Sequence, residues 1–143
     1  MIFREIKFAS NDFSKECELR NSVLRLPLGL NLFDDDLSNE NKQMHFGLFD
    51  EAGKLYACVV AVPTLPDEAK IRQMAVDSKH QGAGYGQYLM VSMEAYLAQL
   101  GFLHFQMHAR VSAVGFYEKR GYTRVGEEFT EIGIPHVEME KWF

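Results

Sequence analysis

The chain has 143 residues, of which 47% are hydrophobic, so it can bury one continuous core, and we expect residues 1–143 to form a single domain. Its formal net charge of −5, without clustered Lys and Arg, excludes a dedicated nucleic-acid surface, and no apolar run is long enough to cross a membrane. Cys17 and Cys58 lack metal-ligand spacing and are expected to be reduced and buried. Because no leader-like segment is present either, we expect a cytoplasmic protein.

The hydrophobic pattern predicts strands near residues 2–8, 44–50, 54–63, 69–76, 103–108, 122–129 and 136–142, and helices near 12–25, 84–100 and 112–120. Turn signals at 50–53 and 63–66 make the first four strands mainly antiparallel. The strands at 69–76 and 103–108 are joined by the long helix and should therefore be parallel, as in a β-α-β crossover. Residues 26–43 lack clear periodicity and are interpreted as a solvated loop, with a capped short helix or a substrate-facing loop as alternatives.

A glycine-rich loop, residues 81–86 (Gln-Gly-Ala-Gly-Tyr-Gly), joins a strand to the long helix and predicts a phosphate-binding turn. Glycine lets the backbone approach a ligand, and the first turn of a helix leaves N–H groups without partners. A simple tight turn is the alternative, although it would need fewer glycines. The chain has no Walker A loop, because Gly53-Lys54 is followed by Leu55, and Leu89 stands where the dinucleotide fingerprint requires Gly or Ala.

The spacing Gln81-x-x-Gly84-x-Gly86 after a strand resembles the acyl-CoA loop of the GNAT superfamily of N-acetyltransferases. Residues 108–122, which contain Phe-Tyr-Glu-Lys at 116–119, resemble the second half of that family's fold, so the resemblance covers roughly residues 45–143. Residues 19–25 and 126–139 are similar to the small bacterial ElaA/YjcF-type branch. The resemblance implies a three-layer α+β fold. Its mixed, mainly antiparallel sheet would have six to seven strands, with a parallel β-α-β crossover at the acyl-CoA site and helices on both faces.

The resemblance also implies an enzyme that moves an acetyl group from acetyl-CoA, its cosubstrate, to a primary amine of a small molecule, peptide or protein, by direct attack in a ternary complex. A non-catalytic CoA-binding or regulatory module of the same fold is the alternative. A nucleotide-phosphate binder is a third reading, but the chain lacks a base-recognition or magnesium motif. A homodimer is one possible assembly.

Tyr117 is the catalytic candidate, because the resemblance places its hydroxyl near the CoA sulfur, where a phenol can donate a proton. Its alternative role is a core aromatic on the face of Ala113 and Phe116. The residues expected to contact acetyl-CoA are Met74, Ala75, Val76, Gln81, Gly82, Ala83, Gly84, Tyr85, Gly86, Gln87, Arg110, Phe116 and Lys119. Backbone N–H groups of 74–76 would serve the thioester carbonyl. Arg110 stands where the superfamily commonly has Asn, which implies a cationic contact to a phosphate or an acidic substrate.

Other polar residues have less definite roles. No general base is evident; Glu127, Glu128, Glu131 and His136 lie near the expected substrate cleft, and water is an equal alternative. We predict no metal site, because His104 and His108 on a strand would be roughly 13 Å apart. Arg25 and Arg72 could bind an acidic substrate group or form surface ion pairs, and His45 is expected in the core or at a strand edge. Gly115 inside a short helix indicates close approach of a cofactor or tight strand packing.

Overall fold

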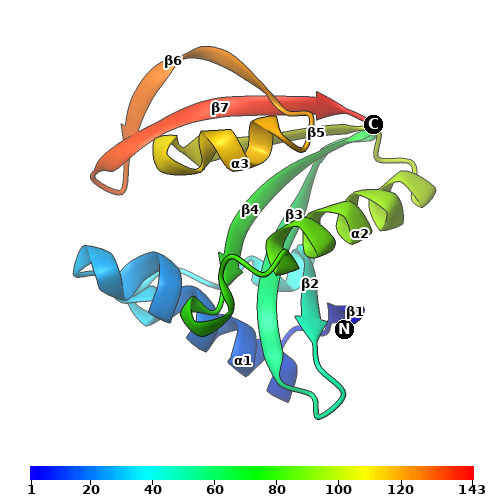
Figure 1. The fold of residues 1–143 in the computed structure, drawn as a ribbon, viewed down its shortest axis with the longest axis vertical. Coiled ribbons are helices and arrows are strands. Elements are labelled where there is room, and N and C mark those ends of the chain that lie inside the picture. The colour runs from blue at the N-terminus through cyan, green and yellow to red at the C-terminus, as the bar shows by residue number, and fades with distance from the viewer.

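The computed structural model describes all 143 residues and contains one seven-stranded sheet in the order β1-β2-β3-β4-β5-β7-β6 (Figure 1). The strands are β1 (Ile2–Ile6), β2 (Met44–Phe49), β3 (Leu55–Leu65), β4 (Glu68–Val76), β5 (His104–Arg110), β6 (Thr123–Glu131) and β7 (Ile134–Trp142). Every neighbouring pair is antiparallel except β4–β5, which is parallel and joined by a helical crossover. The predicted fold class, including its single parallel pair, is confirmed.

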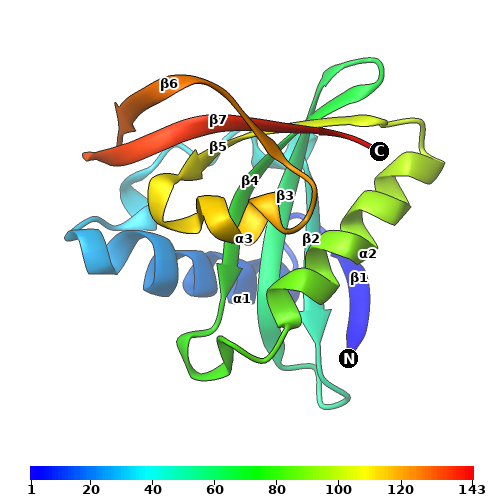
Figure 2. The same ribbon diagram turned by 45° about the horizontal axis from the view of Figure 1, so that its top comes forward.

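Helices cover both faces of the sheet, with α1 (Asn11–Arg20) on one side and α2 (Tyr85–Gln99) and α3 (Val114–Glu118) on the other (Figure 2). The apolar stripe of α2 buries Leu89, Met90, Met93 and Leu97 in the larger core. A smaller core, which includes Cys58, lies beneath α1. Both cysteines are free and buried, as expected. None of the helices has the length and apolar composition that a membrane crossing requires.

The segment after α1 differs from its prediction. The expected helix over 12–25 ends its α-helical part at Arg20 and continues as a π-helical turn, η1 (Asn21–Arg25), and a 3-10 turn, η2 (Leu26–Leu28). Two more 3-10 turns, η3 (Leu32–Asp34) and η4 (Glu40–Lys42), lie in the region that we interpreted as a solvated loop. That interpretation is wrong at η3, because Leu32 is fully buried and the Asn31 side chain caps the turn. The alternative of a capped short helix is correct there.

The parallel strands β4 and β5 separate part-way along their length. They pair only from Glu68–Ile71 against His104–Met107, and Figure 1 shows them diverging beyond that point. A bulge accompanies the divergence, because the β3–β4 register shifts between Cys58 and Val60 and Gln73 adopts a φ of 57°. The splayed strands open the sheet between its two halves, next to the start of α2.

Candidate active site

The glycine loop enters α2 with its backbone donors uncapped. The chain leaves β4 through the short turn η5 (Ser78–His80) and passes Gly82 and Gly84, whose φ angles of 81° and 86° favour glycine. Gly84 is the N-cap residue of α2 and offers no side-chain oxygen to the first-turn N–H groups. Those N–H groups and the helix dipole therefore form a site that favours an anion.

Gly86 serves a different purpose from the other two glycines. It lies within the first turn of α2, and an added Cβ would be 3.2 Å from Met74 Cε and 3.3 Å from Phe116 Cζ. Its missing side chain thus lets α2 pack closely on β4 and α3. Gly115 shows the opposite situation, because an added Cβ would meet nothing within 4 Å. Tight strand packing therefore does not account for Gly115.

A cavity of about 670 Å³, here called the loop cavity, lies between the glycine loop and α3. Eleven of the predicted contact residues line it, namely Met74, Ala75, Val76, Gln81, Gly82, Gly84, Tyr85, Gly86, Gln87, Phe116 and Lys119. Its lining contains no Asp or Glu, although acidic residues outnumber basic ones in the chain, 20 to 15. Ala83 lies in the same loop but outside the lining, and Arg110 lies elsewhere.

Arg120 also lines the loop cavity, although it was not among the residues predicted from the sequence. Its guanidinium lies over the Phe116 ring, 4.3 Å from the centroid, and donates to Phe116 O at 3.1 Å and to Gln87 Oε1 at 2.8 Å. Its Nε is buried without a hydrogen-bond partner. The i, i+4 spacing of Phe116 and Arg120 on a predicted helix was the available signal. Lys119 and Arg120 together place positive charge opposite the start of α2.

A second cavity of about 690 Å³, the sheet cavity, lies among β4, β5, η1 and the β6–β7 turn. It shares five lining residues with the loop cavity, namely Val23, Met74, Gln81, Ala113 and Tyr117. The two cavities therefore meet at the splayed strands, with Tyr117 at their junction. Arg110, Arg25, Arg72, Glu131 and His136 all line the sheet cavity, whereas the exposed Glu127 and Glu128 do not.

Tyr117 is both a core residue and a cavity residue. It is 8% exposed and packs against Phe116 and Tyr122, with ring centroids 5.1 Å and 5.9 Å away. Burial raises the pKa of Tyr117 to about 12, and the nearby charge of Arg110 opposes that shift. The hydroxyl consequently keeps its proton at neutral pH and can act as a donor in the cavity. Tyr117 can therefore be a packed core aromatic and a proton donor at the same time.

The backbone of β4 presents only some of its amides to the cavities. The Asp77 N–H donates to Tyr56 O on β3 at 2.9 Å, and amides of successive strand residues point to opposite sides. The N–H groups of Val76 and Met74 therefore point away from β3, whereas that of Ala75 points toward it. The Gln81 side chain donates to Val76 O at 3.1 Å and so ties the loop to the end of β4.

Glu131 joins two histidines at the sheet cavity. His108 Nδ1 lies 3.0 Å from Glu131 Oε1, and His136 Nε2 lies 3.7 Å from Glu131 Oε2. Burial alone would raise the pKa of Glu131, but the hydrogen bond and charge of His108, with the charges of His136 and Lys70, outweigh it and lower that pKa. Because a carboxylate only accepts, His108 Nδ1 carries the hydrogen of this contact, and Nε2 is the ring atom left to exchange a proton in the cavity. From the sequence alone, His108 was weighed only as a metal ligand.

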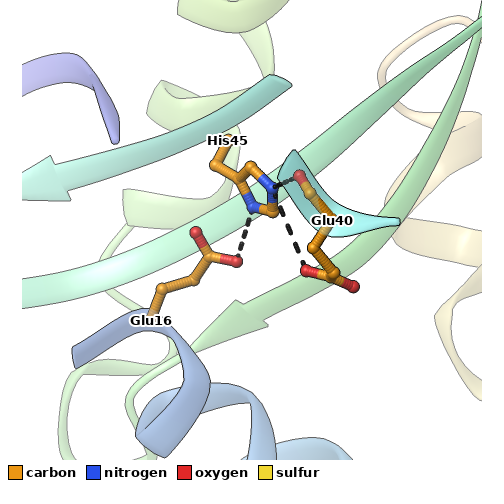
Figure 3. Close-up of side chains that lie close together, drawn as sticks. All are labelled: Glu16, Glu40 and His45. Carbon is orange, nitrogen blue, oxygen red and sulfur yellow. Dashed lines mark hydrogen bonds and ion pairs between the residues drawn. The ribbon is translucent and has the colours of Figure 1, made fainter. Parts of the chain in front are cut away.

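A buried group of Glu16, Glu40 and His45, which was not predicted from the sequence, has atoms close enough to hold a metal ion (Figure 3). The buried Arg20 already supplies the positive charge there. Arg20 Nη1 donates to Glu16 Oε2 at 2.8 Å and to Glu40 Oε1 at 2.7 Å, and His45 Nδ1 lies 2.8 Å from the same Glu16 oxygen. The donor set therefore fits a guanidinium better than a metal ion, and it ties α1 to β2. His45 lies in the core, as expected.

The splayed parallel pair and the uncapped helix beside it define an α+β protein whose sheet opens next to a helix start that favours an anion. The sequence profile of the acetyltransferase (GNAT) domain matches residues 32–143. The chain therefore belongs to the GNAT acetyltransferase family, as the motifs around the glycine loop and Tyr117 predicted.

Individual proteins agree with this assignment. The chain is 38% identical over 73 residues to the uncharacterized N-acetyltransferase YjcF of Bacillus subtilis. The aligned region covers 50% of this chain and 52% of YjcF. The chain spans about half the length of the curated relatives it matches. The crystal structure of Escherichia coli ElaA aligns over 99% of both chains with a TM-score of 0.82 and 20% identity. An aminoglycoside 6′-N-acetyltransferase complexed with coenzyme A aligns over 99% of this chain and 97% of its own, with a TM-score of 0.76 and 17% identity. These two structures share the fold.

Proposed function

We propose that the protein transfers an acetyl group from acetyl-CoA to a primary amine in a ternary complex. The observation that carries this proposal is the meeting of two cavities at Tyr117, one beside the uncapped start of α2 and the other across the splayed strands. Such a pair can hold a cosubstrate and an acceptor on either side of one reacting centre. Membership of the family and the coenzyme A complex of a structural neighbour support the same activity.

The loop cavity suits the phosphate-bearing part of acetyl-CoA. The first-turn N–H groups of α2, together with Lys119 and Arg120, would bind the phosphates, and the buried, unpartnered Nε of Arg120 is a further donor. The absence of any carboxylate in this lining favours an anion throughout the cavity. Met74 and Val76 then lie where the strands separate, so their amides would face the reacting end.

Acetyl-CoA supplies an activated acetyl thioester when bound. The amides of Met74 and Val76 would donate to the thioester oxygen as negative charge develops on it. The Tyr117 hydroxyl, held protonated by its burial, would give its proton to the departing sulfur. The amine must lose a proton before it attacks, and a base within the sheet cavity can accept that proton.

His108 is our proposed base. Its Nδ1–H is held by Glu131 at 3.0 Å, which leaves Nε2 available, and the ring lines the sheet cavity together with Tyr117. Glu131 orients the imidazole and stabilises its charged form, as a carboxylate does in other histidine-based sites. The exposed Glu127 and Glu128 have no comparable position.

The exchange of His108 for glutamine should lower kcat by roughly 10²–10⁴-fold with a basic amine and leave acetyl-CoA affinity unchanged. The loss should be much smaller with methoxyamine, which is already neutral at pH 7 and needs no base to deprotonate it before attack. His104→Gln is the matched control, because His104 lies on the same strand but pairs with Glu68 and Glu140 outside both cavities. Equal losses with both amines would remove His108 from proton transfer.

The activity itself is tested by calorimetry with acetyl-CoA, CoA and ATP, followed by thiol release with a panel of amines. Acetyl-CoA at 100 times its Kd should stabilise the protein by about 2.7 kcal/mol, and acetyl-pantetheine, which lacks the nucleotide phosphates, should bind much more weakly. Binding without thiol release from any amine would favour a non-catalytic CoA-binding module. Stabilisation by ATP but not by CoA would contradict the proposal.

A further inference from the structure

Two guanidinium groups meet at one wall of the sheet cavity. Arg110 Nη2 on β5 donates to Leu24 O at 2.8 Å, and Arg25 Nη1 at the end of η1 donates to the same oxygen at 3.3 Å. The two arginines are distant in sequence, and the fold brings their charges together at one carbonyl. Such a like-charge pair is unfavourable unless a negative group is close.

The protein supplies little negative charge to this pair. Arg25 has one contact with the half-exposed Asp35, at 3.3 Å between Nε and Oδ2. The only hydrogen bond of the Arg110 side chain is to Leu24 O, and no carboxylate is among the charges that act on it. Burial, with the charge of Arg25, lowers the pKa of Arg110, so this guanidinium is held in an unfavourable position. An anion from outside the protein would relieve it.

The rest of the sheet cavity has the same sign of charge. Lys70 and Arg72 on β4 also line it, and the Arg72 guanidinium donates to the neutral Gln43 Oε1 at 3.3 Å. The single carboxylate in the lining is Glu131, which His108 and His136 already engage. A ligand with several ammonium groups would be repelled here, whereas an anionic one would be attracted.

The basic wall lies next to the proposed base. His108 and Arg110 are two residues apart on β5 and therefore point to the same face, roughly 7 Å apart along the strand. Arg72 follows Ile71, the last residue of β4 that pairs with β5, and lines the same cavity as His108. One small molecule could thus reach His108 with its amine and Arg110 with its other end.

We propose that the acceptor is a small amine that carries an anionic oxygen group, a carboxylate or a phosphate, held by Arg25 and Arg110 with Arg72 and Lys70 nearby. A guanidinium fork binds either group in two-point fashion. This assignment rests on the acetyl transfer proposed above and names the acceptor class for the same site. It also gives Arg110 the acidic-substrate role that was one of its two expected contacts.

The direct test compares three acceptors with the same four-carbon chain: 4-aminobutyrate, butylamine and 1,4-diaminobutane. In thiol-release assays kcat/KM should be roughly tenfold or more higher for 4-aminobutyrate than for butylamine, and lowest for the diamine. Added salt should reduce the preference. Phosphoethanolamine against ethanolamine then separates phosphate from carboxylate recognition, and glycine and β-alanine report the preferred length.

Variants locate the anion. Arg110→Gln should reduce the preference for 4-aminobutyrate over butylamine roughly tenfold or more, and Arg72→Gln, which loses a hydrogen bond to Gln43, should reduce it less. Arg124→Gln is the control, because Arg124 is exposed, pairs with Glu118 and lies outside both cavities. Calorimetry of each variant with acetyl-CoA shows whether the substitution weakens binding of the cosubstrate or only recognition of the amine acceptor. A loss of acetyl-CoA affinity in Arg110→Gln, with the acceptor preference intact, would assign Arg110 to the cosubstrate and overturn the proposal.

Binding of products tests the acceptor class without catalysis. On protein saturated with CoA, 4-acetamidobutyrate should bind roughly tenfold or more tightly than N-butylacetamide, which has no charge. Equal affinities for the two products would contradict the anionic acceptor and leave the proposal of acetyl transfer intact. So would faster acetylation of 1,4-diaminobutane than of 4-aminobutyrate by the wild-type protein. Failure to bind acetyl-CoA at all would instead contradict the proposed function.

Discussion

Replacement of Gly84 by aspartate is expected to abolish acetyl-CoA binding and to leave the fold intact. Gly84 has a φ of 86°, and an added Cβ would meet nothing within 4 Å, so the side chain has room. Asp and Asn tolerate positive φ better than other residues do. A carboxylate at this N-cap would lie where we place the phosphates. At about 4 Å and an effective dielectric constant of about 20, the repulsion is about 4 kcal/mol, or about 10³-fold in Kd.

Two matched variants separate charge from backbone strain. Gly84→Asn introduces nearly the same side chain without the charge and should keep most of the affinity that aspartate removes. Gly126→Asp introduces the same carboxylate at a φ of 75° on β6, outside both cavities, and should leave affinity unchanged. Calorimetry gives the Kd and thermal unfolding reports the fold. Wild-type affinity in Gly84→Asp would contradict the placement of the phosphates at the start of α2.

The parts of this protein that could be predicted from sequence are those whose signals are local. The hydrophobic pattern predicted α2 correctly, and Gly101, just past the end of this helix, has the φ of 97° that favours glycine there. The β-α-β crossover followed because one long helix between two strands leaves little choice of direction. Gly121 likewise ends α3 with a φ of 94°.

The features that the sequence did not reveal depend on contacts between distant residues. His108 and Glu131 meet only because β5, β7 and β6 are neighbours in the sheet. Local hydrophobic periodicity does not determine the order of strands in a sheet. Arg25 and Arg110 converge on Leu24 O because α1 continues into the π-helical turn η1. Periodicity alone predicted an uninterrupted helix over residues 12–25. It could not distinguish an arginine that lines a cavity from one that forms an ion pair at the surface.

The buried ion pairs illustrate the same point. Glu16 and Arg20 have the i, i+4 spacing of an ordinary surface pair on a helix, yet both are buried and join Glu40 and His45 beneath the sheet. Their burial depends on β2 and η4 closing over α1. The small bulge at Gln73 is similar, because one residue of register shift in β4 helps to open the sheet at the site.

Exchange of Tyr117 for phenylalanine is expected to slow the chemical step by roughly 10²–10⁴-fold and to change acetyl-CoA affinity very little. Phenylalanine keeps the ring and its packing against Phe116 and Tyr122 but removes the only proton that the side chain can give. With a pKa of about 12, the hydroxyl is protonated throughout the neutral range, so the loss should not depend on the pH of a neutral assay. Single-turnover rates are the proper measurement, because slow product release would hide the effect in kcat.

Tyr122→Phe is the matched control for this experiment. The Tyr122 hydroxyl donates to the buried Glu94 Oε2 at 2.7 Å, and Tyr122 does not line either cavity. Removal of this hydroxyl should therefore lower Tm and leave the single-turnover rate unchanged. The two variants therefore separate a stabilising hydroxyl from a reacting one on adjacent rings of the same core. A wild-type single-turnover rate in Tyr117→Phe would leave Tyr117 as a packing residue. Weaker acetyl-CoA binding in that variant would mean instead that the hydroxyl holds the cosubstrate, and proton donation to the sulfur would then have to come from water.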